Sequence, residues 1–274
     1  MKFRRSERLI DMTNYLLEHP RELVPLTYFA EKYGSAKSSI SEDLGIIKET
    51  FEKQGIGVLQ TVPGAAGGVR FHIYVGEEQA LALGEQLCDI IASPNRLLPG
   101  GYLYMNDILG DPTLVRNVGR LMASAYGNAQ IDAVMTVATK GIPLAHAVAG
   151  YLNVPVVIVR RDPKVTEGST VSINYVSGST KRIQTMVLSK RSLAKGSRVL
   201  IVDDFMKAGG TINGMVDLLR EFDATVSGIA VLVEAKETEE RLVDDYISLI
   251  RLSNVDVKDK KISVTKGNYF SKTK

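Results

Sequence analysis

The stretch that most constrains the fold runs from Val199 to Thr211 and reads VLIVDDFMKAGGT. Four consecutive apolar residues predict a strand that is buried on both faces of a parallel sheet. The acidic residues Asp203 and Asp204 follow, and a turn of small residues then leads into a helical pattern. Glycines let backbone N–H groups approach phosphate oxygens, and a helix N-terminus adds a favourable dipole. We therefore expect a phosphate site whose acidic pair accepts hydrogen bonds from sugar hydroxyls.

A bare Gly-Gly-Thr turn is also typical of a tight strand-to-helix connection capped by Thr211. The whole stretch is more specific, and it resembles the phosphoribosyl pyrophosphate (PRPP) motif of the type I phosphoribosyltransferases. That resemblance implies an effector-binding site formed by Asp203, Asp204, Phe205, Met206, Lys207, Ala208, Gly209, Gly210 and Thr211. The enzymes usually carry Thr or Ser where this chain has Lys207 and Ala208. This departure weakens the expectation of ordinary enzyme chemistry.

An alternation of strands and helices begins at Ile131 and predicts an open parallel sheet. The expected strands cover residues 133–138, 154–159, 199–202 and 225–233. Ligands of such sheets bind at the carboxyl ends of the strands. Besides the acidic pair, the residues at these ends are Thr139, Lys140, Gly141, Arg160 and Arg161. The resemblance makes residues 139–141 the pyrophosphate loop, and the ring of Tyr102 is a candidate for stacking on a base.

The segment between the second and third strands is polar and predicts a long hairpin, with Val171–Tyr175 paired to Ile183–Leu188. Residues 160–198 carry 9 Lys or Arg against 2 Asp or Glu, which concentrates positive charge beside the phosphate site. A solvated basic loop is the plainer alternative. The resemblance implies a flexible loop that closes over PRPP, and a further hypothesis is that Lys181 and Arg182 touch DNA. The lysine-rich tail after Asp256 is expected to be exposed, and residues 94–104 are expected to be irregular.

The N-terminal residues predict a winged helix-turn-helix. The expected elements are helices over residues 5–17 and Leu26–Tyr33, a serine-capped helix after Gly34, and a hairpin of strands Val58–Val62 and Val69–Val75. Basic residues crowd the start of the first helix, which is unfavourable for the helix dipole and favours contact with a phosphate backbone. Simple surface charge is the alternative. The candidate DNA-binding residues are Arg4, Arg5, Arg8, Lys37, Ser38, Ser39, Ser41 and Arg70.

Composition narrows the class of protein further. The single cysteine, Cys88, excludes an internal disulfide framework and fits a reducing compartment. No apolar run approaches the roughly 20 residues of a membrane span, and no signal peptide is recognisable, so we expect a cytoplasmic protein without a membrane partner. With only 3 histidines, no metal site is expected.

A winged helix over residues 1–75 followed by a phosphoribosyltransferase-like domain over residues 76–274 resembles the purine operon repressors of Gram-positive bacteria. That resemblance implies a homodimer that binds double-stranded DNA upstream of purine biosynthesis and salvage genes. It also implies that PRPP, with or without Mg²⁺, opposes DNA binding, and that guanosine tetraphosphate-type nucleotides compete for the same pocket. No catalytic residue and no required cofactor are expected.

Two other functions stay open on the sequence alone. One is an active purine phosphoribosyltransferase with a regulatory N-terminal domain, in which Tyr102, Tyr104 or Phe205 would stack on the base. The other is a nucleotide-binding scaffold that uses its helix-turn-helix for dimerisation. Turnover of PRPP with a purine base would separate the enzyme from the repressor.

Overall fold

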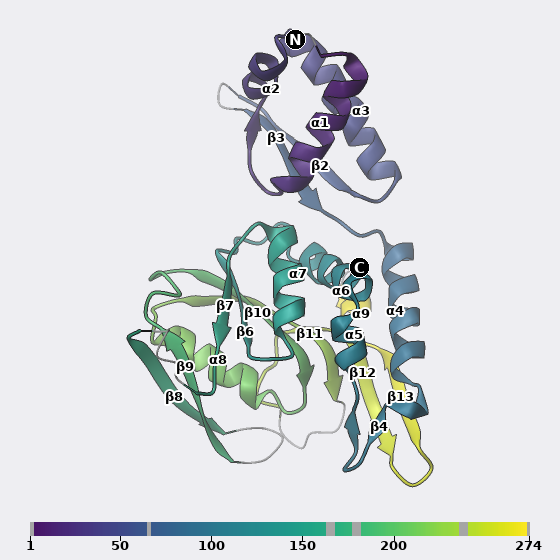
Figure 1. Cartoon of the computed structure of the whole chain (residues 1–274), viewed down its shortest axis with the longest axis vertical. Coiled ribbons are helices and arrows are strands. Elements are labelled where there is room, and N and C mark those ends of the chain that lie inside the picture. The colour runs from purple at the N-terminus through teal and green to yellow at the C-terminus, as the bar shows by residue number, and fades with distance from the viewer. Residues whose placement is uncertain (1–2, 65–66, 163–167, 177–181, 236–240, 273–274) are drawn as a thin grey trace.

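The chain forms two domains joined by the short segment of residues 74–76 (Figure 1), in a computed structural model that describes residues 3–64, 67–162, 168–176, 182–235 and 241–272. The N-terminal domain contains α1 (Arg5–Glu18), β1 (Val24–Pro25), α2 (Leu26–Tyr33), α3 (Lys37–Lys53), β2 (Gly57–Val62) and β3 (Gly68–Ile73). No helix in these described ranges is long and apolar enough to cross a membrane.

The N-terminal domain is the winged helix-turn-helix that the sequence predicts. Its three helices bury Phe29, Ile40 and Phe51 in one apolar core. The strands form a sheet of order β1-β3-β2, in which β2 and β3 are the expected hairpin. The prediction of a serine N-cap for α3 is wrong, because the N-cap is Ala36 and no side chain caps this helix.

A buried carboxylate joins α1 to α3. The side chain of Asp43 on α3 has no exposed surface, and it accepts hydrogen bonds from Arg5 Nε at 2.8 Å and from Arg8 Nε at 3.0 Å and Nη2 at 2.8 Å. The side chain of Arg8 is 13% exposed and that of Arg5 is 53% exposed. The pairing compensates a charge that would otherwise be expensive to bury.

The second domain is built around a six-stranded sheet of order β13-β12-β11-β10-β6-β7. Its elements are α4 (Glu77–Ile91), a 3₁₀ turn (Pro94–Arg96), β4 (Leu97–Leu98), β5 (Tyr102–Leu103), α5 (Asn106–Gly110), α6 (Pro112–Ala125), β6 (Ala133–Val137), α7 (Ile142–Leu152), β7 (Val156–Val159), β8 (Thr170–Val176), β9 (Ile183–Ser189), β10 (Arg198–Met206), α8 (Gly210–Arg220), β11 (Thr225–Ala235), β12 (Ile247–Asp256), β13 (Lys261–Lys266) and α9 (Tyr269–Lys272). Asp111 caps α6 through its carboxylate, as its position before Pro112 predicts.

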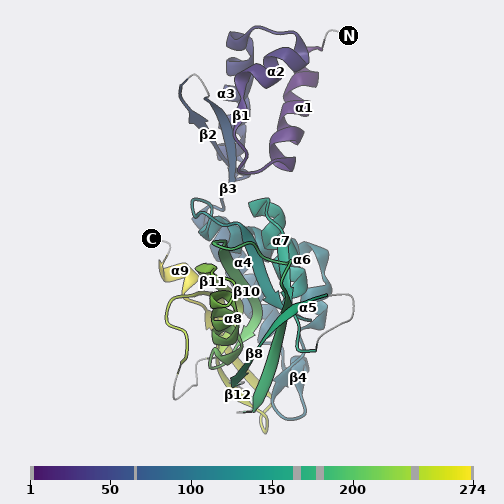
Figure 2. The same cartoon turned by 90° about the vertical axis from the view of Figure 1, so that its left-hand side faces the viewer.

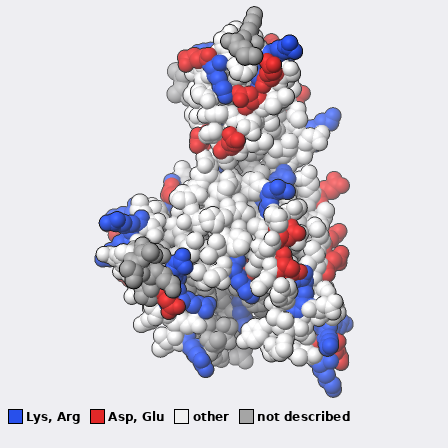
Figure 3. All heavy atoms as spheres, in the orientation of Figure 1, with Lys and Arg blue, Asp and Glu red and all other residues white. Residues whose placement is uncertain are grey.

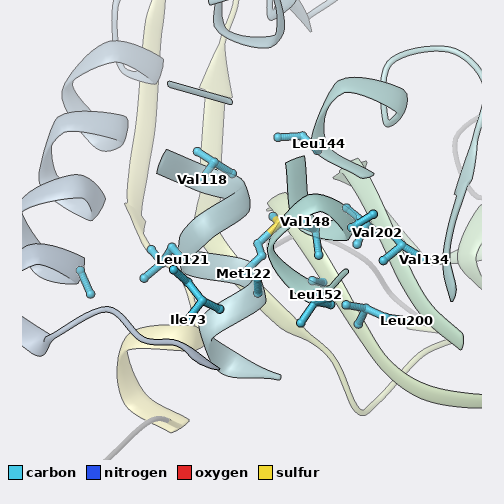
Figure 4. Close-up of a cluster of buried hydrophobic side chains, with 14 of the residues drawn as sticks. Ile73, Val118, Leu121, Met122, Val134, Leu144, Val148, Leu152, Leu200 and Val202 are labelled. Carbon is cyan, nitrogen blue, oxygen red and sulfur yellow. The ribbon is translucent and has the colours of Figure 1, made fainter. Parts of the chain in front are cut away.

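The expected open parallel sheet is confirmed, with helices on both faces. Within this sheet the neighbouring strands β7, β6, β10, β11 and β12 run parallel, and β13 is antiparallel to β12. Figure 4 shows Leu144, Val148 and Leu152 of α7 packed against Leu200 and Val202 of β10. On the opposite face α8 covers residues of β6 and β10 in a second apolar cluster.

Three details of the second domain differ from the sequence predictions. Strand β10 does not end at Val202 but continues through both acidic residues to Met206. The tail after Asp256 is not simply exposed, because β13 pairs with β12 and buries Ile262. The segment before Tyr104, read as irregular, contains the short hairpin β4–β5.

The polar insertion forms the hairpin that the sequence predicts. Strands β8 and β9 pair antiparallel with Val171 opposite Leu188, and the hairpin packs on α8. Beside Gly214 of that helix lie Tyr175 and Met186, close enough that a side chain there would collide with the Tyr175 ring. The expectation of a closing loop and of DNA contact through Lys181 falls partly on residues 163–167 and 177–181, which lie outside the described residues.

The two domains contact each other at the end of α7 that lies below the winged helix in Figure 1. The guanidinium of Arg21 donates to the carbonyl of Leu152 at 3.3 Å and to the carbonyl of Ala129. Asn153, which follows α7, donates to the Glu22 carboxylate at 2.8 Å. Arg21 therefore places a cation at the C-terminus of α7, where the helix dipole favours it.

Replacing Asp43 with Ala should destabilise the winged helix by about 2 kcal/mol, because two arginines lose their shared buried acceptor. Urea unfolding followed by circular dichroism would measure this. Glu42→Ala is the matched control, since Glu42 is exposed and lies 3.7 Å from Arg5, and it should change stability by less than about 0.5 kcal/mol. Equal effects of the two substitutions would contradict the structural role of Asp43.

Candidate functional site

Parallel pairing brings the predicted phosphate-binding loops to one edge of the sheet. Strand β10 lies between β6 and β11, with Ile201 opposite Met135 on one side and Asp203 opposite Val231 on the other. All three strands therefore end at the same edge. The loop after β6 begins with a cis peptide between Ala138 and Thr139.

Gly141 holds this loop directly against the acidic pair. A Cβ atom at Gly141 would lie 2.1 Å from Thr136 Oγ1 and 3.1 Å from Asp203 Oδ1. The φ of Gly141 is −69°, so the position needs glycine for close approach and not for backbone conformation. The structure thus brings residues 139–141 and Asp203 together, as the strand order predicts.

The acidic pair is held in a desolvated position. Asp203 is 6% exposed, and its Oδ1 accepts the backbone N–H of Asp204 at 2.9 Å. Burial, together with the charge of Asp204, raises the pKa of the Asp203 carboxyl well above its usual value. Burial also raises the pKa of Asp204, against the opposing effects of its hydrogen bond with Asp203 and the nearby charge of Lys140. Two adjacent carboxylates with so little solvent favour a ligand that donates hydrogen bonds or brings a cation.

The turn after β10 has the geometry of an anion site. Lys207 is exposed, and Gly209 adopts a left-handed conformation with a φ of 86°, immediately before α8 begins at Gly210. The alternative of a turn capped by Thr211 is wrong, because Gly209 is the N-cap and no side chain caps α8. The first N–H groups of a helix have no partner within it, so this turn offers them to a phosphate.

The remaining residues of the predicted effector site lie in different surroundings. Met206 is buried in the apolar cluster under α8, so only its backbone can face a ligand. Phe205 is half-buried on β10. Arg160 pairs with Val187 of β9 through two backbone hydrogen bonds of 3.0 and 2.8 Å. Tyr102 is 69% exposed on the β4–β5 hairpin, at the end of the domain farthest from the winged helix (Figure 2).

The candidate DNA-binding residues divide into two groups. Arg4, Lys37, Ser38 and Ser41 are exposed, and Ser39 is partly exposed near the start of α3. Two arginines are instead engaged within the protein, since Arg5 and Arg8 bind Asp43. Arg70 is partly buried, and its buried Nε has no hydrogen-bond partner among the described residues. Among these predictions, contact of Arg8 with DNA has the least support, because its guanidinium already binds the buried Asp43.

Several residues at the sheet edge were missed from the sequence. Thr136 has a buried hydroxyl without a hydrogen-bond partner among the described residues, and it touches the position of Gly141. Arg161, which the sequence does place at a strand end beside Arg160, lies close enough to Asp203 to lower its pKa, against the larger opposing effects of burial and of the Asp204 charge. Glu234, at the end of β11, is buried with arginine partners. A single acid in the apolar run of β11 was the signal that could have identified it.

Positive charge surrounds part of this domain. Figure 3 shows Lys and Arg side chains on the side formed by β8 and β9, and Asp and Glu along α4 on the opposite side, where further Lys and Arg side chains also lie. This distribution follows the charge asymmetry of the sequence. Such a field favours an anionic ligand near the sheet edge.

Replacing Asp203 with Asn should raise the melting temperature at neutral pH by roughly 2–4 °C, because it removes a buried charge worth about 1 kcal/mol. Since the fold raises the pKa of this carboxyl, the wild type is most stable where the group is protonated. The advantage of the variant should shrink as the pH falls towards the ordinary value of 3.8. Thermal scans between pH 4 and 7.5, with Asp89→Asn on the exposed face of α4 as control, measure this. A lower melting temperature at every pH would contradict it.

Known proteins resemble both domains. The family model of the bacterial purine repressor N-terminal domain matches residues 4–73, and the phosphoribosyl transferase domain model matches residues 105–264. The purine biosynthesis transcriptional repressor PurR of Bacillus subtilis is 64% identical over 270 residues, covering 98% of this chain and 95% of the relative. The purine biosynthesis transcriptional activator PurR of Lactococcus lactis is 51% identical and covers 98% of this chain and 99% of the relative.

Solved structures support the fold of the second domain. The adenine phosphoribosyltransferase of Giardia lamblia aligns with a TM-score of 0.55 at 23% identity, and covers 62% of this chain and 98% of that structure. This likeness concerns the fold alone. The chain belongs to the family of purine repressors, transcriptional regulators of purine biosynthesis in which a DNA-binding winged helix precedes a phosphoribosyltransferase-like domain.

Proposed function

We propose that this protein represses purine biosynthesis and salvage genes by binding double-stranded DNA upstream of them, and that PRPP relieves this binding. The observation that carries the proposal is the phosphoribosyltransferase-type site at the sheet edge, joined through α7 to a winged helix. The relative with 64% identity is named a repressor, whereas one with 51% identity is named an activator. The higher identity favours repression.

The chemistry of PRPP matches the groups at the sheet edge. The ribose hydroxyls would donate to Asp203 and Asp204, and the N–H groups of Gly210 and Thr211 would hold the 5′-phosphate. The loop of residues 139–141 would hold the pyrophosphate. Where Mg²⁺ accompanies PRPP, Asp203 and Asp204 would be the residues able to compensate its charge, since this ion prefers carboxylate and phosphate oxygens. Guanosine tetraphosphate-type nucleotides share these polyphosphate groups and would compete.

We also propose that the site senses PRPP without transferring its phosphoribosyl group. Lys207 and Ala208 replace the hydroxyl residues that resembling enzymes use around the 5′-phosphate. A homodimer is part of the proposal because the winged helix, with 10 Lys or Arg against 9 Asp or Glu in residues 1–74, is nearly neutral. Two modest DNA contacts would then add to a useful affinity.

Helix α7 offers the route from PRPP to DNA. It begins at Ile142, directly after the pyrophosphate loop, and ends at Leu152, whose carbonyl accepts from Arg21 of the winged helix. A displacement of the loop on ligand binding would move this rod, about 16 Å long, against its contact with the winged helix. PRPP can weaken DNA binding only if it binds more tightly to the conformation with low DNA affinity.

A gel shift on DNA from upstream of a purine gene, with and without PRPP, tests the function. We expect PRPP to weaken the complex of the wild type, and the Asp203→Ala/Asp204→Ala variant to bind DNA normally but to ignore PRPP. A full PRPP response of this variant would contradict the site. Incubation with PRPP and each purine base is the second arm, and release of pyrophosphate with nucleotide formation would contradict the sensor and support the enzyme.

The α7 route predicts that Arg21→Lys reduces the factor by which PRPP weakens DNA binding, because lysine cannot reach two carbonyls with one planar group. By linkage, DNA should weaken PRPP binding by the same reduced factor. Fluorescence titrations of each ligand in the presence of the other measure both factors. Arg220→Lys, on the exposed end of α8, is the control, and an unchanged factor in Arg21→Lys would exclude this route.

A further inference from the structure

Glu234 is a buried acid close to the proposed effector site, and its carboxylate is bound by other side chains of the protein. It lies on β11 opposite Met206 of β10, next to the turn proposed above to hold the effector phosphate. Its side chain is 1% exposed. An acid in this position requires compensation, and its partners show what it holds in place.

Four donors saturate the Glu234 carboxylate. Arg241 and Tyr246 both donate to Oε2, while Ser248 donates to Oε1 at 2.8 Å and Arg251 Nε donates to Oε1 at 3.0 Å. Arg241 also donates to the carbonyl of Ala235 at 2.7 Å, and its guanidinium lies 5.2 Å from the centre of the Tyr246 ring. We call Glu234, Arg241, Tyr246 and Arg251 the Glu234 clasp.

The clasp anchors a segment that touches the phosphate turn. Immediately after Arg241, the backbone N–H of Leu242 donates to the carbonyl of Ala208 at 2.9 Å. The next residue, Val243, packs against Gly209, with its Cγ2 3.0 Å from the position of a Gly209 Cβ. The segment therefore supports, from outside, the residue whose left-handed conformation sets the start of α8.

The cavity beside the clasp is poorly suited to bind the effector phosphate directly. The clasp lines a cavity of about 300 Å³ together with Val243 and Asp244. Two arginines and two acids line it, so it carries little net charge to attract a phosphate. The carboxylate of Glu234 accepts four hydrogen bonds, which uses its lone pairs. The arrangement fits a support for the turn.

We propose that the Glu234 clasp is a positioning device that fixes the Ala208–Gly209 turn for the phosphate of the effector. This inference rests on the proposed function, since it assigns the support of the same site. Phosphate binding by backbone N–H groups depends on their alignment, and small displacements of such groups weaken it. Without the clasp, the turn would lose the support that Leu242 and Val243 give to Ala208 and Gly209.

The test compares PRPP affinity with DNA affinity in Arg241→Ala, Arg241→Lys and Glu234→Gln. Isothermal titration with PRPP should show a dissociation constant about tenfold higher for Arg241→Ala than for the wild type, which is comparable to the loss of one charge-assisted hydrogen bond. Arg241→Lys should recover part of this affinity. DNA binding without PRPP should match the wild type in a gel shift, which also shows that each variant is folded. Arg220→Ala, which removes an exposed arginine from the far end of α8, is the matched control and should bind PRPP normally.

The outcomes separate this inference from the proposed function. If the wild type does not bind PRPP, the proposed function fails. If the wild type and Arg220→Ala bind PRPP and the folded Arg241→Ala and Glu234→Gln variants bind it within twofold of them, only the clasp fails. If Arg241→Ala unfolds, Glu234→Gln decides, because it keeps the volume of the side chain but removes the charge that holds both arginines, and PRPP affinity within twofold of the wild type would overturn the clasp.

Discussion

The parallel pairing of β10 with β6 on one side and β11 on the other is the constraint on which the site depends. Because the three strands end at one edge, the loop before α7, the acidic pair and Glu234 all reach the same region from distant parts of the sequence. Gly141 then closes the distance to Asp203, since any side chain at that position would collide with Thr136. The sheet thus supplies the position of each group, and the local residues supply the chemistry.

The sequence predicted the parts of this arrangement that have strong local signals. Continuous apolar runs identified the central strands, and Asp111 before Pro112 identified the start of α6. Edge strand β13 was missed because its lysines mask the alternation around Ile262. The capping role considered for Thr211 was wrong because a hydroxyl at a helix start can equally serve a ligand, and only the observed position of the cap, at Gly209, separates the two.

Charge was harder to interpret than apolar patterning, because a sequence does not show which charges pair. The arginines near the start of α1 suggested DNA contact, yet Arg8 compensates Asp43, a buried acid on α3. The same limitation hid Glu234 and Arg241. In each domain a buried acid, Asp43 or Glu234, joins secondary-structure elements through arginine partners. Lys37 and Ser38, in contrast, are exposed at the start of α3.

Helix α7 has the Arg21 cation at its C-terminus, and its N-terminus follows the loop that is proposed to hold the pyrophosphate. Electrostatics alone would couple these ends weakly, because the effect of a helix dipole is confined to its terminal turns. The helix is also about 16 Å long, which is roughly twice the Debye length at physiological salt. The proposed coupling between effector and winged helix would therefore depend on movement of the helix as a rigid body. Because α7 packs closely against Leu200 and Val202, it can shift only if β10 and its acidic pair adjust as well, so a bound effector and the winged helix would act on the same packed unit.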